Sequence, residues 1–589
     1  MKKRGRSLLW GLLCFGMCLS VQASWSTRIQ TDPSRVRIQM SSMLDGLPNK
    51  GHVPIRIQIQ NTGSSGGTWT FDFRSSISWQ EQDVLNYPTR VSLQPGEERI
   101  LEVMVPLYPL QEGGRGVHIQ PRLRVNMGGP GLESTSQQLF SMGQSRIGSE
   151  VVALSTSLAG RNKSAIEQRI QTSGGHYQDR VLSAGLSVFP EDIRGLSGLD
   201  FLIITPGEWG ALERGNQYLL MQWIGRGGHL LLAAPADTPL PAAFQPYRGE
   251  AGTASLGWGS VFPVVMNGDI LDPDELLSQM NQIRRDRPSP GRGEFLPRVW
   301  QLRELIPDVE RPLFLLLIAV IAIAVFLGPL NVVVAFRRKR PVQLLWMTPM
   351  LSIGLSLALL LLILLMDGFG GKGHRAVTIF LLPAENLEIV AQEQVSRTGV
   401  LLRRSFALPA TATIQRLRVD YGHRRGSQGV FSALPGGQWD GDWFESRAIQ
   451  GQAMIDSRPS RARLEFIPAT GNAPPEVLSS IDAELSQVIL RDFDGNYWRT
   501  ENVRAGSRTP LKSTTPEEGR KFIRSLSLRE GERVLPVTGP GVFLAQVAAG
   551  DGLFLESLDS IRWDRQEARY TGFLSRAGGT RANGEGGAQ

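Results

Sequence analysis

The sequence contains two long apolar runs, LFLLLIAVIAIAVFLGPLNVVVA at residues 313–335 and VQLLWMTPMLSIGLSLALLLLILLM at residues 342–366. Neither run contains a charged residue. At about 1.5 Å of rise per residue, the first run would span roughly 35 Å as a helix, which exceeds a hydrocarbon core of about 30 Å. The two runs predict a multidomain membrane protein with transmembrane helices at residues 312–336 and 342–366.

A basic turn at residues 337–341 joins the two runs. Because cationic loops stay in the cytoplasm, its four cations predict that the domains on either side lie outside the plasma membrane. These topology determinants are Arg337, Arg338, Lys339 and Arg340. Within the runs, a small residue, two prolines and an amide predict helix packing, with a break at each proline and a hydrogen bond across the pair. These packing residues are Gly328, Pro329, Asn331 and Pro349.

The first 23 residues have the composition of a secretory signal peptide. Four cations precede an apolar stretch from Leu8 to Leu19, and Val21-Gln22-Ala23 offers a cleavage site. The two cysteines, Cys14 and Cys18, both lie in this segment. The mature chain would therefore contain no disulfide and no thiolate nucleophile. The net charge of +8 is spread along 589 residues, and no nucleic-acid-binding module is evident.

Residues 24–145 predict an immunoglobulin-like β-sandwich. Val53, Ile55, Ile57 and Ile59 alternate with polar residues, and a second alternating segment begins at Trp69 after a Gly/Ser turn. Such modules usually bind or separate other domains.

Residues 146–270 change to an α/β pattern. A buried strand at residues 201–204 precedes a helix at 216–226, which ends at Gly227-Gly228 before the apolar strand at 229–234. This order predicts a parallel sheet covered by helices. Residues 271–311 then form a juxtamembrane linker. Strand patterns return over residues 367–576, which predicts a mostly β domain, and the Gly-rich tail at 577–589 is typical of disorder.

Two segments carry a family resemblance. The stretch from Leu199 to Pro206, with Trp223 and Gly227-Gly228 before the next strand, resembles the class I glutamine amidotransferase-like fold. Active members of that family carry a cysteine on the following turn, where this chain has Ala234-Pro235-Ala236-Asp237. The resemblance therefore implies a relative of that fold without amidotransferase chemistry.

The hairpin motifs resemble a second group. Gly328-Pro329 with Asn331, and the LWxxP pattern ending at Pro349, are similar to uncharacterised bacterial inner-membrane proteins that often carry an amidotransferase-like domain. Some are encoded near MoxR-type ATPases and von Willebrand A-domain proteins. The resemblance implies protein partners of that kind, in addition to the lipid bilayer.

Glu208 and Trp209 are the candidate ligand-binding residues. They follow the strand at 201–204, and ligands of open α/β sheets bind at the carboxyl ends of strands. The alternative is structural: Glu208 in the first turn of a helix, with Trp209 packed beneath it. The six histidines do not pair at metal-ligand spacing, so neither a metal nor a cofactor is expected, and no catalytic residue is assigned.

Together these patterns favour an inner-membrane-anchored periplasmic scaffold, or the binding subunit of an envelope complex, with an inactive amidotransferase-like domain. Two alternatives stay open. One is a cell-envelope hydrolase that uses Ser, Asp or a metal in place of Cys. The other is an accessory subunit of a transporter.

Overall fold

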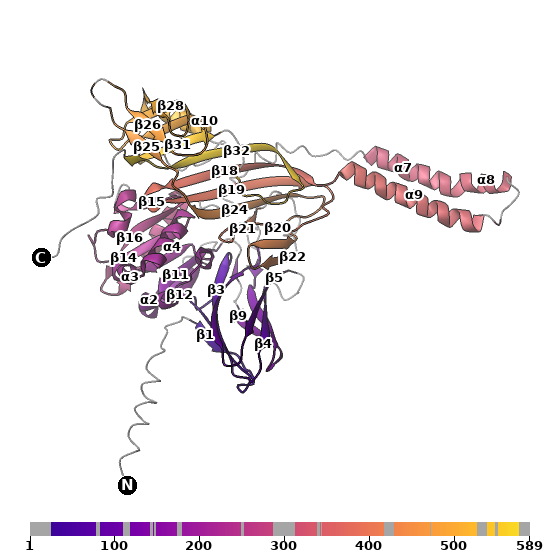
Figure 1. Ribbon diagram of the computed structural model, residues 1–589, viewed down its shortest axis with the longest axis horizontal. Helices are drawn as coiled ribbons and strands as arrows, with labels where there is room; N and C mark the ends of the chain where they lie inside the picture. The colour runs from indigo at the N-terminus through magenta and orange to yellow at the C-terminus, as the bar shows by residue number, and fades with distance from the viewer. Residues whose placement is uncertain are drawn as a thin grey trace, which may run out of the picture.

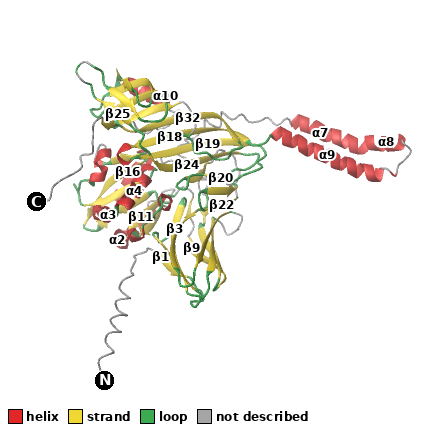
Figure 2. Ribbon diagram, viewed as in Figure 1, coloured by secondary structure: helices red, strands yellow, loops and turns green. Residues whose placement is uncertain are grey.

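The computed structural model describes residues 25–77, 83–109, 118–141, 145–146, 149–172, 179–248, 252–286, 313–337, 342, 344–417, 429–469, 471, 473–526, 539–547, 550 and 552–576. The predicted signal peptide, the linker beyond residue 286 and the tail from 577 lie outside these residues. The described residues form several packed β-sheets, a small group of helices on one of them, and a helical hairpin that projects from the body (Figures 1 and 2).

Two sheets face each other in the N-terminal part and share one core. The first sheet has the order β1(Trp25–Arg28), β2(Val36–Ser42), β3(His52–Asn61), β6(Glu98–Pro106). The second has the order β20(Phe406–Ala407), β23(Gln438–Gly441), β22(Val430–Leu434), β5(Val84–Leu93), β4(Gly67–Ser76), β8(Arg122–Gly129), β9(Leu132–Ser141). The alternating apolar residues of β3 and β4 point inward, so that Ile55, Ile57 and Phe71 are fully buried. A short pair, β7(His118–Ile119) with β10(Ser145–Arg146), lies apart.

Three strands of the second sheet come from residues 406–441, far along the chain. β22 pairs in parallel with β5, and the Gly429 amide donates to Asp83 Oδ1 at 3.1 Å. Strand alternation alone did not indicate this pairing. The N-terminal sandwich is therefore completed by the C-terminal part of the protein.

A parallel sheet with helices on both faces follows. Its main path is β12(Arg180–Ala184), β11(Val151–Ser155), β13(Phe201–Ile204), β14(His229–Ala234), β16(Gly259–Asn267), β15(Ala254–Leu256), with β17(Ile270–Leu271) paired to β16. The helical segments are α2(Thr156–Thr172), η1(Leu186–Val188), η2(Ile193–Leu196), α3(Pro206–Ala211), α4(Arg214–Gly225), η3(Ala242–Tyr247) and α5(Pro273–Asp286). Strands β11 to β14 and β16 run parallel, in agreement with the strand–helix–strand order of the sequence.

Both faces of this sheet are buried, which explains the continuous apolar runs of β13 and β14. One face packs against α2 and α5. The other packs against α4 and, beyond it, against Leu382 and Ile389 of the large C-terminal sheet. The α/β unit is thereby joined to the C-terminal part through a common apolar layer.

The C-terminal part is built on a nine-stranded sheet. Its order is β21(Thr413–Leu417), β24(Ile449–Pro459), β19(Leu387–Thr398), β18(Gly371–Leu382), β32(Ile561–Phe573), β31(Val542–Val547), β27(Leu485–Arg491), β28(Tyr497–Val503), β30(Lys512–Thr514). A smaller sheet has the order β29(Arg508–Pro510), β26(Glu476–Ser479), β25(Leu464–Ile467), β33(Ser575–Arg576). The short helices are η7(Pro383–Glu385) and α10(Pro516–Leu526).

The helical hairpin contains the two apolar runs (Figure 1). The first run is divided into α7(Leu313–Val325), a π-helical turn at Phe326–Leu330 and α8(Asn331–Arg337), and the second forms α9(Leu344–Asp367). Pro329 lies in the π-helical turn, because proline lacks the N–H that a continuous α-helix needs. The buried Asn331 amide donates to Thr348 Oγ1 at 3.0 Å across the pair.

The membrane prediction requires correction. Among the residues that the structure describes, no helix combines the length and the apolar character that crossing a membrane requires. The π-helical turn around Pro329 leaves α7 with 13 residues, or about 20 Å. This finding contradicts the predicted fold class, with its transmembrane hairpin, and the predicted inner-membrane localisation.

The other hairpin residues lie as follows. Arg337 is exposed at the end of α8, whereas Arg338, Lys339 and Arg340 lie outside the described residues, so their role as topology determinants has no support here. A Cβ on Gly328 would meet no atom within 4 Å, so this glycine is not a point of close helix approach. Pro349 lies exposed within α9.

Candidate ligand-binding cavity

The two sequence-predicted site residues have structural roles. Thr205 caps α3, and Glu208 completes a capping box: its Oε2 accepts from the Thr205 amide at 2.8 Å, while Thr205 Oγ1 accepts from the Glu208 amide at 3.1 Å. The other carboxylate oxygen accepts from Ser157 Oγ at 2.6 Å. Trp209 is buried against Phe244, with ring centroids 4.7 Å apart. Both residues therefore occupy the positions that the structural alternative predicted.

The Trp-x-x-x-Gly-Gly motif has a packing explanation. Gly227 follows the end of α4 with φ +111°, a conformation that suits glycine after a helix. A Cβ on Gly228 would lie within 3.0 Å of three atoms of the Trp223 indole, which real Cβ atoms essentially never do. The indole is buried and donates to the Leu199 carbonyl at 3.3 Å. The motif therefore shapes the end of α4 and turns the chain into β14.

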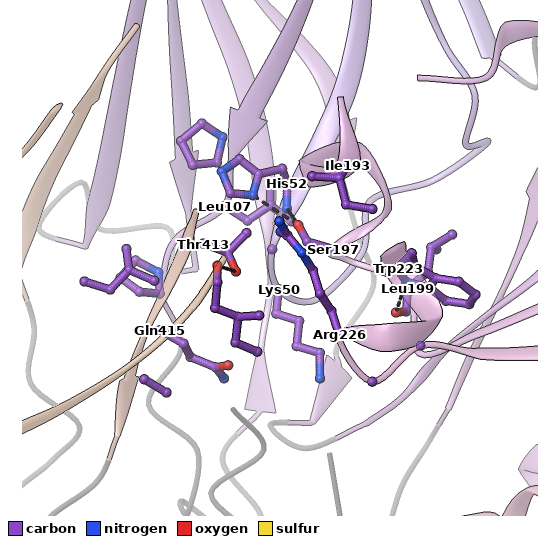
Figure 3. A pocket seen from close by; sticks show the side chains of 18 of the residues that line it. Lys50, His52, Leu107, Ile193, Ser197, Leu199, Trp223, Arg226, Thr413 and Gln415 are labelled. Atoms are coloured by element: carbon purple, nitrogen blue, oxygen red, sulfur yellow. Dashed lines mark hydrogen bonds between the residues drawn. The ribbon is translucent and has the colours of Figure 1, made fainter. Parts of the chain in front are cut away.

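A cavity of about 120 Å³ lies beside this helix end (Figure 3). Its walls come from three parts of the chain. The N-terminal sandwich contributes residues 50–52 and 106–109, the α/β unit contributes residues between 193 and 228, and the C-terminal part contributes residues between 413 and 455. We call it the junction cavity, because it lies where these three parts meet.

Arg226 is a charged side chain that links the α/β unit to the C-terminal part. It extends from the end of α4 into the space between the three segments (Figure 3), and its side chain is only 8% exposed. Its Nε donates to Ser457 Oγ at 2.6 Å and its Nη1 to the Thr411 carbonyl at 3.0 Å. Burial lowers the pKa of Arg226 to about 10, against the attraction of Asp456, so the guanidinium stays charged at neutral pH.

Two tryptophans line the cavity from the C-terminal side. Trp439 lies on β23, and Trp443 follows that strand, with ring centroids 5.1 Å apart in an edge-to-face arrangement. The turn before β23 contains Gly436 and Gly437, whose φ angles of +89° and +83° favour glycine. This Gly-Gly turn allows β22 and β23 to pair, which positions the two indoles.

An ion pair occupies another wall. Lys50 Nζ lies 3.0 Å from Asp200 Oδ1, and Asp200 Oδ2 accepts from the Val151 amide at 2.9 Å. Asp200 is 4% exposed. The pair joins the N-terminal sandwich to the start of the parallel sheet and makes this wall of the cavity polar.

His52 and Ser197 meet across the same junction. His52 Nδ1 and the His52 amide each lie 3.1 Å from Ser197 Oγ, and that hydroxyl donates to the Arg194 carbonyl at 2.6 Å. Because the Ser197 hydroxyl donates its proton to this carbonyl, its oxygen can only accept from His52. Nδ1 therefore carries the proton of the neutral imidazole and donates to Ser197. Burial, then the positive charges of Arg194 and Arg226, lower the pKa of His52 to about 3, although Asp192 opposes them.

A pH-dependent stability follows from His52. The unfolded histidine binds a proton near pH 6.5 and the folded one near pH 3, so stability from this group is complete above pH 6.5 and is lost as the pH falls toward 3. The expected slope is about 1.4 kcal/mol per pH unit between those values. Urea unfolding at pH 6 and pH 4.5, for the protein and for His52→Gln, measures it. Equal slopes in the two proteins would contradict the assignment.

The described residues contain no group of three or more His, Cys, Asp or Glu side chains arranged to hold a metal ion. Sequence reasoning did not identify the junction cavity. Its charged and aromatic residues are separated by as many as 393 positions (from Lys50 to Trp443), and the only local signal was the Gly-Gly motif next to Arg226.

Comparisons with known proteins do not assign the chain to a family. No family model matches it, and no curated protein matches it. Among solved structures, a β-glucuronidase from Bacteroides uniformis shares 10% identity over 35% of this chain and 24% of that one, with a TM-score of 0.15. A β-D-mannosidase from Dictyoglomus thermophilum shares 10% identity over 84% and 76% of the two chains, with a TM-score of 0.14. The chain spans about a quarter of the length of the first of these structures, and neither score supports a shared fold.

Proposed function

We propose that this protein is a scaffold or binding protein whose α/β unit is catalytically inactive. The proposal rests on the hydrogen bonds of the Glu208 carboxylate. The acid at the carboxyl edge of the parallel sheet has both oxygens bonded within the helix cap or to Ser157, so it is held as a structural group. The turn after β14, where the amidotransferase resemblance would place a cysteine, reads Ala-Pro-Ala-Asp.

The junction cavity gives the binding proposal a location. Its walls come from three parts of the protein, so an occupant would contact all three and stabilise their packing. The resemblance stated above implies protein partners as well, and MoxR-type ATPases and von Willebrand A-domain proteins are the first to test with purified components.

A serine hydrolase is the second candidate, because Ser197 and His52 lie within hydrogen-bond distance. Two features oppose it. The Ser197 hydroxyl donates to a carbonyl and therefore has no proton directed at His52. A general base works best with a pKa near the operating pH, and the pKa of His52 is about 3.

A screen of the purified full-length chain against ester and amide substrates separates the two candidates. We expect no turnover above the blank, and we expect Ser197→Ala and Glu208→Ala to match the unchanged chain. Turnover that either substitution abolishes would overturn the proposal in favour of a hydrolase. Arg562→Met, at an exposed ion pair outside the cavity, serves as the matched control.

A further inference from the structure

A tight turn follows β16 at the carboxyl end of that strand. Asn267 pairs with Ile270, so the loop between β16 and β17 consists of Gly268 and Asp269. Gly268 has a φ of +64°, whereas the φ of Asp269 is not positive. A positive φ at the first central residue alone defines a type II′ turn, which favours glycine at that position. The turn therefore presents the sequence Asn-Gly at the surface, where both residues are exposed.

Two groups in this turn have no hydrogen-bond partner among the described residues. One is the side-chain amide of Asn267. The other is the backbone amide of Gly268, which lies outside the strand pairing and donates to no carbonyl of the turn. A Cβ on Gly268 would meet no atom within 4 Å, so the space beside this amide is open. Water reaches both groups.

The two groups can react with each other. When the Gly268 amide loses its proton to hydroxide, its nitrogen attacks Cγ of Asn267. A new C–N bond forms, the bond to the side-chain nitrogen breaks, and this nitrogen takes a proton from water and leaves as ammonia. Water then opens the resulting succinimide ring at one of its two carbonyls, which yields aspartate or isoaspartate. Glycine favours the attack because it has no Cβ to obstruct ring closure.

Asn267 differs in this respect from the other asparagines that the structure describes. None of those precedes a glycine, and the second Asn-Gly pair of the sequence, Asn583-Gly584, lies outside the described residues. Asn281 provides a close comparison within α5. It precedes Gln282, and its Oδ1 accepts from Arg284 Nη1 at 2.7 Å. Its amide is therefore held by a hydrogen bond inside a helix.

We propose that Asn267 is a site of spontaneous deamidation, at which the succinimide route converts the amide to aspartate and isoaspartate. The inference goes beyond the proposed function and does not depend on what the junction cavity binds. Either product adds a negative charge close to Asp269, whose carboxylate pairs with Arg161 of α2. Isoaspartate also adds a carbon atom to the main chain, so that residue 267 cannot keep its register with Ile270.

The modification has a structural consequence because the turn is fixed to α2. Asn162, which is 1% exposed, donates from Nδ2 to the Asp269 carbonyl at 3.0 Å. Its Oδ1 accepts from the Leu271 amide at 2.8 Å. A main chain lengthened at residue 267 displaces these partners, so the isoaspartate form should have a lower Tm than the unmodified chain.

Incubation of the full-length chain at pH 6 and pH 8, followed by tryptic digestion and mass spectrometry, tests the proposal. Cleavage after Arg248 and Arg284 leaves Asn267 and Asn281 in one peptide, so each sample contains its own reference. We expect carboxylate to form at residue 267 at least tenfold faster than at residue 281. The rate should be at least tenfold higher at pH 8 than at pH 6, because the attack requires a deprotonated amide. Methyl transfer from S-adenosylmethionine by a protein carboxyl methyltransferase measures isoaspartate separately.

Variants separate the turn from the rest of the chain. Asn267→Gln cannot form the five-membered ring and should lower conversion at this position at least tenfold, with an unchanged Tm because the side chain is exposed. Asn583→Gln is the matched control and should leave conversion at Asn267 unchanged. If Asn583 converts and Asn267 does not, the turn protects its amide and the proposal is wrong. Equal rates at Asn267 and Asn281 would also overturn it.

Discussion

Gly228→Ala is expected to lower the free energy of unfolding by about 3 kcal/mol or more, since overpacking a closely packed site costs on this scale. A Cβ at this position would lie within 3.0 Å of three atoms of the Trp223 indole. The indole is 3% exposed and bonded to Leu199, so it has little room to move. Chemical denaturation monitored by tryptophan fluorescence measures the loss.

Gly215→Ala, in the first turn of α4, is the control. A Cβ there would meet no atom within 4 Å, so alanine should keep or slightly raise the stability of the protein. Trp223→Leu combined with Gly228→Ala should recover part of the stability, because the smaller side chain makes room for the added methyl group. If Gly228→Ala were as stable as Gly215→Ala, the packing explanation of the motif would be wrong.

Local sequence patterns predicted strands such as β3 and β13, because the burial of alternate or successive residues leaves its pattern within the strand itself. Alternation in β3 places Ile55, Ile57 and Ile59 on one buried face, and the apolar run of β13 matches a strand covered on both sides. The capping role of Glu208 was also readable. Thr205 and Glu208 have the Thr-x-x-Glu spacing of a capping box, and this signal outweighs the general rule about strand ends.

The hairpin shows how uniform apolar composition misleads. The two runs were interpreted as spans from their length and their lack of charged residues, but the first run does not form one continuous α-helix. The π-helical turn at Phe326–Leu330 divides the first run. Pro329 was visible in the sequence and predicted a break in the helix, but not that α7 would end before it.

The cavity was beyond sequence reasoning for a different reason. Its position depends on the parallel pairing of β22 with β5, between segments about 346 residues apart, and on the docking of α4 against β19. Neither pairing leaves a periodic signal in one segment.

The second large effect is expected at Arg226, which fixes the α/β unit to the nine-stranded sheet. Arg226→Met keeps much of the side-chain volume but removes the donors to Ser457 and Thr411, and it leaves Asp456 without its nearby cation. Removing one member of a buried ion pair costs about 3–5 kcal/mol. Because Asp456 lies 3.9 Å away without a hydrogen bond, we expect about 3 kcal/mol.

Arg562→Met provides the contrast. Its ion pair with Asp564 is shorter, at 2.7 Å, but the two side chains are 70% and 37% exposed, so its loss should cost less than about 1 kcal/mol. Asp456→Asn in the Arg226→Met background removes the uncompensated charge and keeps an acceptor for Thr411, which bonds Asp456 at 2.7 Å. This double variant should be more stable than Arg226→Met alone, which a double-mutant cycle measures. If the two arginine substitutions cost the same, burial would have no bearing on the value of these pairs, and Arg226 would not be the link between the α/β unit and the C-terminal sheet.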